Sequence, residues 1–202
     1  MVARVGEIMY VMHANIELEV SYMSDAVTIH LIETFRASDA AGAVAGIWRD
    51  ATGVSDEDAQ AFASGTFPKH VGWPGFRLHI AAIDANPLGF IYGYRSLPGQ
   101  WWHDEVRDAL INAGHEAWVQ NALELAEVAV LPQFQGRGIG TRLIDSFLKD
   151  VAQPVLLALE AEDHRTHTLY AAHGFHDLLT DFRYVGFDDR IIVMGRPGEG
   201  DS

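Results

Sequence analysis

The sequence predicts a single α/β domain, with a mixed central sheet of about seven strands and helices on both faces. The chain has 202 residues, 49% of them hydrophobic, which is ample for one buried core and short for two. Apolar runs of strand length alternate with segments of helical periodicity. Turn signals rich in glycine and proline separate these segments, and the sequence contains no internal repeat.

We assign the domain to residues 25–196. Residues 1–24 are interpreted as an N-terminal extension of uncertain structure, in which Met23 is an alternative start. The apolar patch from Ile8 to Met12 is short, and no small-residue cleavage pattern follows it, so we expect no export signal and a cytoplasmic protein. Residues 197–202 are glycine-rich and acidic and are expected to be a disordered tail.

Composition excludes several kinds of function. The chain has no cysteine, which rules out disulfides, thiolate metal sites and cysteine nucleophiles. No apolar run reaches the ~18 residues that a membrane helix needs, so we expect no membrane partner. The formal net charge of −14 repels phosphate backbones and argues against nucleic acid as a partner. The same charge suits a cationic amine, although acidity also serves solubility alone.

In the first part of the domain, apolar alternation predicts a strand over residues 26–35. Two helices follow, at about residues 40–50 and 55–63. The expected N-caps are polar side chains just before each helix, Ser38 or Asp39 for the first and Ser55 for the second. Residues 66–75 contain proline and glycine near both ends and are predicted to be a loop.

The middle of the chain predicts a hairpin and then an insert. Strands are expected at residues 77–83 and 88–94, joined through a turn that contains Asn86 and Pro87. The polar and aromatic insert covers residues 98–121, with a short helix at about residues 104–111.

The last part of the chain alternates between the two kinds of element. Strands are expected at 122–131, 155–159, 176–184 and 190–194, and helices at 138–151 and 165–173. Gly174 is placed to end the second of these helices.

A glycine-rich turn lies between the strand at residues 122–131 and the amphipathic helix that follows it. Its sequence is Gln-Gly-Arg-Gly-Ile-Gly-Thr over residues 135–141. Glycines let a backbone approach a ligand closely, and a helix N-terminus offers unpaired N–H groups to an anion. The turn lacks the third glycine of a dinucleotide fingerprint and the lysine of a nucleotide P-loop. We therefore predict a phosphate site of another kind.

Two motifs resemble the GNAT superfamily of acyl-CoA-dependent N-acyltransferases. The first is Q-x-x-G-x-G, formed by Gln135, Gly138 and Gly140. The second resembles the family pattern N-x-x-A-x-x-L-Y-x-x-x-G-F over residues 163–175, with Asp163 in place of the usual Asn and Thr166 in place of the usual Ala. The two motifs together cover residues 124–175. The resemblance implies an N-acetyltransferase with acetyl-CoA as co-substrate.

The resemblance also implies which residues hold the coenzyme. The strand before the turn pairs with the pantetheine arm in this family, and the turn binds the pyrophosphate. The positions implied are Val128, Ala129 and Val130 on the strand, Gln135, Gly136, Arg137, Gly138, Ile139, Gly140 and Thr141 in the turn, and Asp163 in the second motif. No metal is expected, because the ten histidines include no HExxH pattern.

Catalysis needs a base for the amine and an acid for the leaving thiolate. By resemblance, Tyr170 is the acid and a carboxylate on the strand, Glu127 or Glu124, is the base, with a slight preference for Glu127. Residues three apart on a regular strand face opposite sides, so at most one of the two carboxylates enters the cleft unless a bulge intervenes.

The acceptor is expected to be a primary amine, either a small molecule or a protein amine. Trp73, Trp101 and Trp102 lie in the two irregular stretches and are candidates for binding it, because aromatic rings can enclose an ammonium group. Two alternatives stay open: a non-catalytic acyl-CoA-binding sensor or partner-binding module with the same fold, and a homodimer formed through edge strands.

Overall fold

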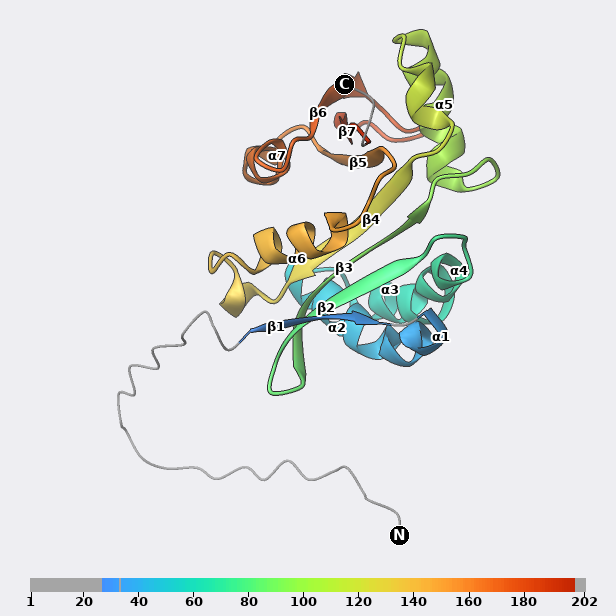
Figure 1. The fold of residues 1–202 in the computed structure, drawn as a ribbon. Coiled ribbons are helices and arrows are strands. Elements are labelled where there is room, and N and C mark those ends of the chain that lie inside the picture. Colours follow the sequence, from blue (N-terminus) through green and yellow to red (C-terminus); the bar gives the residue numbers. More distant parts are fainter. Residues whose placement is uncertain (1–26, 33, 199–202) are drawn as a thin grey trace, which may run out of the picture.

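The computed structural model describes residues 27–32 and 34–198. Its core is a seven-stranded sheet in the order β1-β2-β3-β4-β5-β7-β6, shown in Figure 1. The strands are β1 Thr28–Ile32, β2 Arg77–Ile83, β3 Asn86–Arg95, β4 Leu123–Val130, β5 Val155–Glu160, β6 His176–Phe182 and β7 Ile191–Arg196. Neighbouring strands are antiparallel except β4 and β5, which are parallel. The predicted mixed sheet of about seven strands is confirmed.

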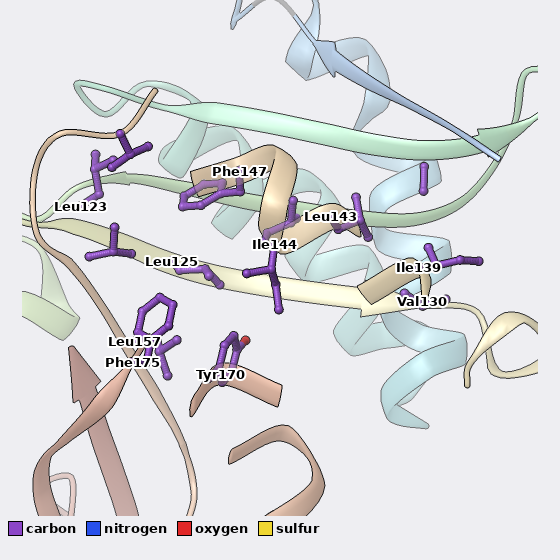
Figure 2. Packing of buried hydrophobic residues seen from close by; sticks show 14 of the residues in the cluster. Leu123, Leu125, Val130, Ile139, Leu143, Ile144, Phe147, Leu157, Tyr170 and Phe175 are labelled. Carbon is purple, nitrogen blue, oxygen red and sulfur yellow. The ribbon is translucent and has the colours of Figure 1, made fainter. Parts of the chain in front are cut away.

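Helices cover both faces of the sheet. On one face, α6 (Ile139–Leu148) and α7 (His164–Ala171) share a core with the sheet. Figure 2 shows Leu143, Ile144 and Phe147 of α6 packed over Leu125 of β4. On the other face, α2 (Ala41–Thr52), α3 (Asp56–Ala61) and α4 (Phe67–Val71) cover β2 and β3. The insert forms α5 (Trp101–Asn112) and the short turn Glu116–Val119, which pack against β5 to β7.

The N-terminal part differs from the sequence prediction. The first strand ends at Ile32, and a short helix α1 (Thr34–Ala37) occupies the expected end of that strand. Neither Ser38 nor Asp39 caps α2, because Ala40 precedes this helix and makes no side-chain capping bond. Ser55 does cap α3, since its Oγ accepts a hydrogen bond of 3.1 Å from the Asp58 N–H. The extension expected at residues 1–24 and the tail residues 199–202 lie outside the described part of the chain.

The loop predicted at residues 66–75 is wrong over its first half. The helix continues from α3 through a π-helical turn, Phe62–Thr66, into α4. Phe62 and Phe67 are buried and their ring centroids lie 5.9 Å apart, so burial of both rings favours the continued helix. Pro68 stands in the first turn of α4, a position that proline tolerates in a helix.

Candidate active site

The parallel pair at the centre of the sheet is short. β4 and β5 pair only at Leu123 with Val155 and at Glu124 with Leu156. Beyond Glu124 the two strands diverge, and a cleft of about 850 Å³ opens between them. The cleft is lined by β4 from Leu125 to Val130, the glycine turn, the start of α6, the end of β5 and one side of α7. The divergence therefore exposes one edge of β4 to a ligand.

The glycine turn has the backbone that an anion site needs. Gly136 and Gly138 have φ values of +73° and +77°, a conformation that side-chain-bearing residues rarely adopt. Gly138 is the N-cap of α6 and supplies no side-chain capping bond, so the first N–H groups of α6 stay available. Gln135 closes the turn through its own side chain, whose Nε2 donates a 2.9 Å hydrogen bond to the Val130 carbonyl.

Most of the positions implied for the coenzyme line this one cleft. They are Val128, Ala129, Val130, Gln135, Gly136, Gly138, Ile139, Gly140, Thr141 and Asp163. Arg137 is not among the lining residues, and its guanidinium lies over the Phe134 ring, 5.4 Å from the centroid. Asp163 caps α7, because its Oδ1 accepts a 3.0 Å hydrogen bond from the Thr166 N–H.

A β-bulge decides where the two candidate bases point. Tyr92 of β3 pairs with Glu127, whereas the next residue, Gly93, pairs with Leu125, so Ala126 is an extra residue in β4. The bulge reverses the alternation between Glu124 and Glu127. Both carboxylates consequently face the side of the sheet that carries α2 to α4, beside the tyrosines that pair with them.

The environments of the two carboxylates differ. Glu124 is 5% exposed; its Oε1 accepts a 2.7 Å hydrogen bond from the Tyr94 hydroxyl, and its Oε2 has no protein partner. Burial raises the pKa of Glu124 to about 8; Glu127 also raises it, and the Tyr94 bond opposes the shift. Glu127 lines the cleft and is partly exposed. Burial raises the pKa of Glu127 to about 7, against a hydrogen bond from the Trp48 side chain.

Tyr170 lies on α7 and lines the same cleft as Glu127. It is 4% exposed, and its ring meets Phe175 edge-on with centroids 5.5 Å apart. Figure 2 shows the ring on the face that also carries Phe175 and α6. Burial raises the pKa of Tyr170 above its usual value, and the charges of Glu127 and Asp163 add to this effect. The hydroxyl therefore keeps its proton at neutral pH.

The three candidate tryptophans do not meet. Trp73 packs against His70 and Tyr94, with ring centroids 4.4 and 4.5 Å away. Trp102 is buried near the other end of the sheet, where its Nε1 donates a 3.0 Å hydrogen bond to the Tyr184 hydroxyl. Trp101 is exposed beside Tyr184. The first tryptophan thus belongs to the α2–α4 side and the other two to the insert.

Several residues of the site carry no recognisable sequence signal. They are Trp48, His70, Tyr92, Tyr94 and Arg165, the last of which lines the cleft beside the glycine turn. His70 Nδ1 lies 3.1 Å from the Tyr92 hydroxyl, and burial lowers the pKa of His70 to about 4, so this ring is neutral. The regular alternation of β3 would have placed Tyr92 and Tyr94 on one face, but the chain gives no sign of the bulge opposite them.

Two features that would favour other functions are absent from the described part of the chain. Over residues 27–32 and 34–198, no group of three or more His, Cys, Asp or Glu side chains is arranged to hold a metal ion. None of the helices in those ranges has the length and apolar character required to cross a membrane.

Comparisons with known proteins agree with this geometry. The acetyltransferase (GNAT) domain family matches residues 74–177. A GCN5-like protein acetyltransferase of Mycobacterium tuberculosis is 33% identical over 122 residues, which are 56% of this chain and 59% of that protein. The alignment thus spans less than two thirds of the relative's length.

Solved structures show the same fold. A GNAT-family structure from Desulfovibrio desulfuricans has a TM-score of 0.62 and 16% identity, and covers 85% of this chain and 99% of its own. The ribosomal-protein-S18-alanine N-acetyltransferase of Escherichia coli has a TM-score of 0.58 and 17% identity, with coverage of 87% and 96%. An N-acetyltransferase of Thermoplasma acidophilum, solved with coenzyme A, has a TM-score of 0.53 and 12% identity, with coverage of 85% and 98%. The chain belongs to the GNAT family of acetyltransferases.

Proposed function

We propose that this chain is an N-acetyltransferase that transfers an acetyl or other short acyl group from CoA to a primary amine by direct attack. The observation that carries the proposal is the cleft between β4 and β5. One cleft is lined by the glycine turn, by the free edge of β4 and by the side chains of Glu127 and Tyr170, which can exchange protons.

The residues of the cleft fit acetyl-CoA. The uncapped N-terminus of α6 and the two left-handed glycines suit a pyrophosphate, and Gly138 has no atom within 4 Å of the position where a Cβ would stand. Arg165 lines the cleft near Gly136 and offers a cation to a phosphate group. The edge of β4 that β5 leaves unpaired suits the amide groups of the pantetheine arm.

Glu127 is the better placed of the two candidate bases, because it lines the cleft and Glu124 does not. A pKa near the working pH suits a group that must first take a proton and then release it. In our proposal Glu127 takes a proton from the amine nitrogen, directly or through one water. Bound acetyl-CoA supplies the thioester carbon, which gains a bond to that nitrogen and loses its bond to sulfur.

The edge of β4 stabilises the charge on the thioester oxygen, and Tyr170 neutralises the charge on the departing sulfur. Backbone N–H groups of β4 that lack a strand partner stabilise the negative charge that develops on the thioester oxygen. Tyr170 gives its proton to the departing sulfur, because the hydroxyl is protonated at neutral pH and lines the cleft. The products are the N-acylated amine and free CoA.

The acceptor is proposed to be an amine on a protein or on a small molecule. The name of the Mycobacterium tuberculosis relative describes a protein acetyltransferase, which favours a protein amine. The carboxylates of Glu124 and Glu127 lie on the α2–α4 side with the aromatic rings of Trp73 and Tyr94. Together these groups suit a cationic group.

Thiol release separates an enzyme from a coenzyme-binding sensor. Purified protein is incubated with acetyl-CoA and a panel of primary amines, including lysine-containing peptides, peptides with a free N-terminus, and small amines. An enzyme releases free thiol with at least one amine, and the Glu127→Gln variant releases far less. A protein that binds acetyl-CoA but gives no amine-dependent thiol release with any member of the panel would contradict the proposal and favour the sensor.

A further inference from the structure

Exposed apolar side chains gather at one end of the molecule. Among the described residues, five large hydrophobic side chains are exposed: Leu31, Trp101, Ile111, Val185 and Phe187. Three of them, Trp101 at 55%, Val185 at 85% and Phe187 at 59% exposure, lie at the start of α5 and in the β6–β7 connection. We call these three residues, together with Tyr184, the apolar surface.

Contacts within the chain hold the residues of the apolar surface in place. The Trp101 and Tyr184 ring centroids lie 5.0 Å apart, and the Val185 N–H donates a 3.1 Å hydrogen bond to Glu105 Oε2 of α5. The Phe187 N–H donates a 3.0 Å bond to the Tyr184 carbonyl, which folds the connection back on itself. Figure 1 shows α5 beside the strands β6 and β7 that this connection joins. Rings such as those of Trp101 and Phe187 are usually buried in the core. Their exposure together suggests a role in an interaction.

The two segments that carry the apolar surface are acidic. Residues 101–108 and 181–190 contain six carboxylates and three arginines. Each arginine is already paired within the chain, Arg107 with Asp108, Arg183 with Asp181 and Arg190 with Glu162. Asp188 and Asp189 follow Phe187 directly and are exposed, and Asp104 is exposed on α5. The surface therefore offers apolar contacts inside a negatively charged rim.

Tyr184 connects this surface with the interior of the site. Its hydroxyl accepts the hydrogen bond from Trp102. Burial raises the pKa of Tyr184 to about 12; the Trp102 bond opposes this shift, and the charges of Glu124 and Glu105 add to it. Glu124 lies inside, on the same face of the sheet as Tyr94 and Glu127, and Glu105 lies outside, bonded to the Val185 N–H. Leu156 of β5 pairs with Glu124 and belongs to the same cluster as Trp102 and Tyr184. The apolar surface therefore borders the face of the sheet that carries Glu124 and Glu127.

We propose that the apolar surface, Trp101, Tyr184, Val185 and Phe187, binds an apolar side chain of a basic acceptor polypeptide near the amine that is acetylated. This assignment rests on the proposed function and narrows its acceptor to a protein or peptide. Charge complementarity favours this occupant, because lysines and arginines beside the apolar residue would face Asp188, Asp189 and Asp104. Exposed aromatic rings at the centre of a polar rim are the usual composition of such contact surfaces.

Two short fluorescein-labelled peptides test the assignment by fluorescence anisotropy, in the presence of CoA. Both carry several lysines on a glycine–serine background, and one has a leucine where the other has a serine. We expect the leucine peptide to bind about tenfold more tightly, and both peptides to bind more weakly at high salt. Serine at both Val185 and Phe187 should abolish the leucine preference.

Leu31→Ser is the matched control, because Leu31 is 60% exposed, like Phe187, but lies on the edge strand β1. It should keep the full leucine preference. The double variant Asp188→Asn and Asp189→Asn should weaken both peptides equally. This variant alters only exposed side chains, so its fold is safe.

Three outcomes would overturn the assignment. One is equal binding of the two peptides by the unaltered protein, and a second is an equal loss of preference in Leu31→Ser. The third is a dimer in sedimentation that the Phe187→Ser substitution converts to a monomer, because a second copy of the chain would then cover the surface. Calorimetry with acetyl-CoA keeps the two proposals apart. A protein that shows the leucine preference but binds no acetyl-CoA contradicts the transferase function and leaves only a peptide-binding surface.

Discussion

The two sides of β4 carry different types of residue. Many of the residues that line the cleft beside α6 and α7 are small, among them three glycines of the turn. The α2–α4 side instead carries the aromatic side chains Trp48, Trp73, Tyr92 and Tyr94. With them lie the buried Glu124 and the partly exposed Glu127. A ligand bound through backbone needs only the right turn and strand edge, whereas an acceptor is recognised by particular side chains. Under the proposed function, the first side would bind the co-substrate and the second would select the acceptor.

The largest effect should come from the residue that belongs to both sides. We expect Glu127→Gln to lower kcat by about 10²- to 10⁴-fold, because an amide cannot take the proton of the amine. Binding of acetyl-CoA should be unchanged. Glu160→Gln, an exposed position at the end of β5, is the control and should keep full activity. Steady-state kinetics checks this, and a Glu124→Gln variant that loses more than Glu127→Gln would reverse the roles of the two carboxylates.

Removing the proton donor should have a smaller effect. Tyr170→Phe is expected to lower kcat by about 100-fold, at the low end of general-acid effects, because a thiolate can leave without full protonation. The ring remains to pack against Phe175, so folding should be preserved. Single-turnover measurements on the variant check the rate of the chemical step. An unchanged rate would show that the sulfur takes its proton from elsewhere.

The pH dependence of kcat should follow Glu127. Its pKa is raised to about 7 and the deprotonated form is active, so kcat should rise with pH up to about 7 and level off above it. Below the pKa the rate should fall about tenfold per pH unit. A rate profile from pH 5 to 9 at saturating acceptor checks this. If kcat of the Glu127→Gln variant rose with pH in the same way, the rise would come from the titration of another group.

The smallest effects are expected on the free energy of unfolding, from substitutions of two glycines that differ in how closely they are packed. A Cβ at Gly93 of β3 would meet the Glu124 carbonyl and, at 2.7 Å, the Phe147 ring. Gly93→Ala should therefore lower the free energy of unfolding by about 1–3 kcal/mol. Gly46→Ala, inside α2 with nothing within 4 Å of its Cβ position, should instead raise it by about 0.4–1 kcal/mol. Chemical denaturation of both variants measures the contrast, and equal effects would contradict the close approach at Gly93.

The sequence carried more information about one side than about the other. Positive-φ glycines and helical periodicity are local signals, so the turn at residues 135–141 and the helix after it were predictable. The bulge at Ala126 was not, because Leu-Glu-Leu-Ala-Glu-Val-Ala-Val is compatible with a regular strand. Without the bulge, Glu124 and Glu127 would have pointed to opposite faces.

Long-range packing explains the other differences. Pro68 and Gly72 predicted a loop, but burial of Phe62 and Phe67 against β2 and β3 outweighs that local preference. Tyr94 and Glu124 are 30 residues apart in the chain and meet only across paired strands. No spacing rule within one segment reveals such a pair.

The most direct test of the account is calorimetry of acetyl-CoA binding to the unaltered protein, to Gly138→Glu and to Gly114→Glu. Both glycines have positive φ, +77° and +85°, and both have open space around the Cβ position, so the two substitutions impose similar backbone strain. Only Gly138 borders the proposed pyrophosphate site. We expect micromolar binding by the unaltered protein and by Gly114→Glu, and loss of binding in Gly138→Glu. Equal binding by all three proteins would contradict the assignment of the cleft to acetyl-CoA.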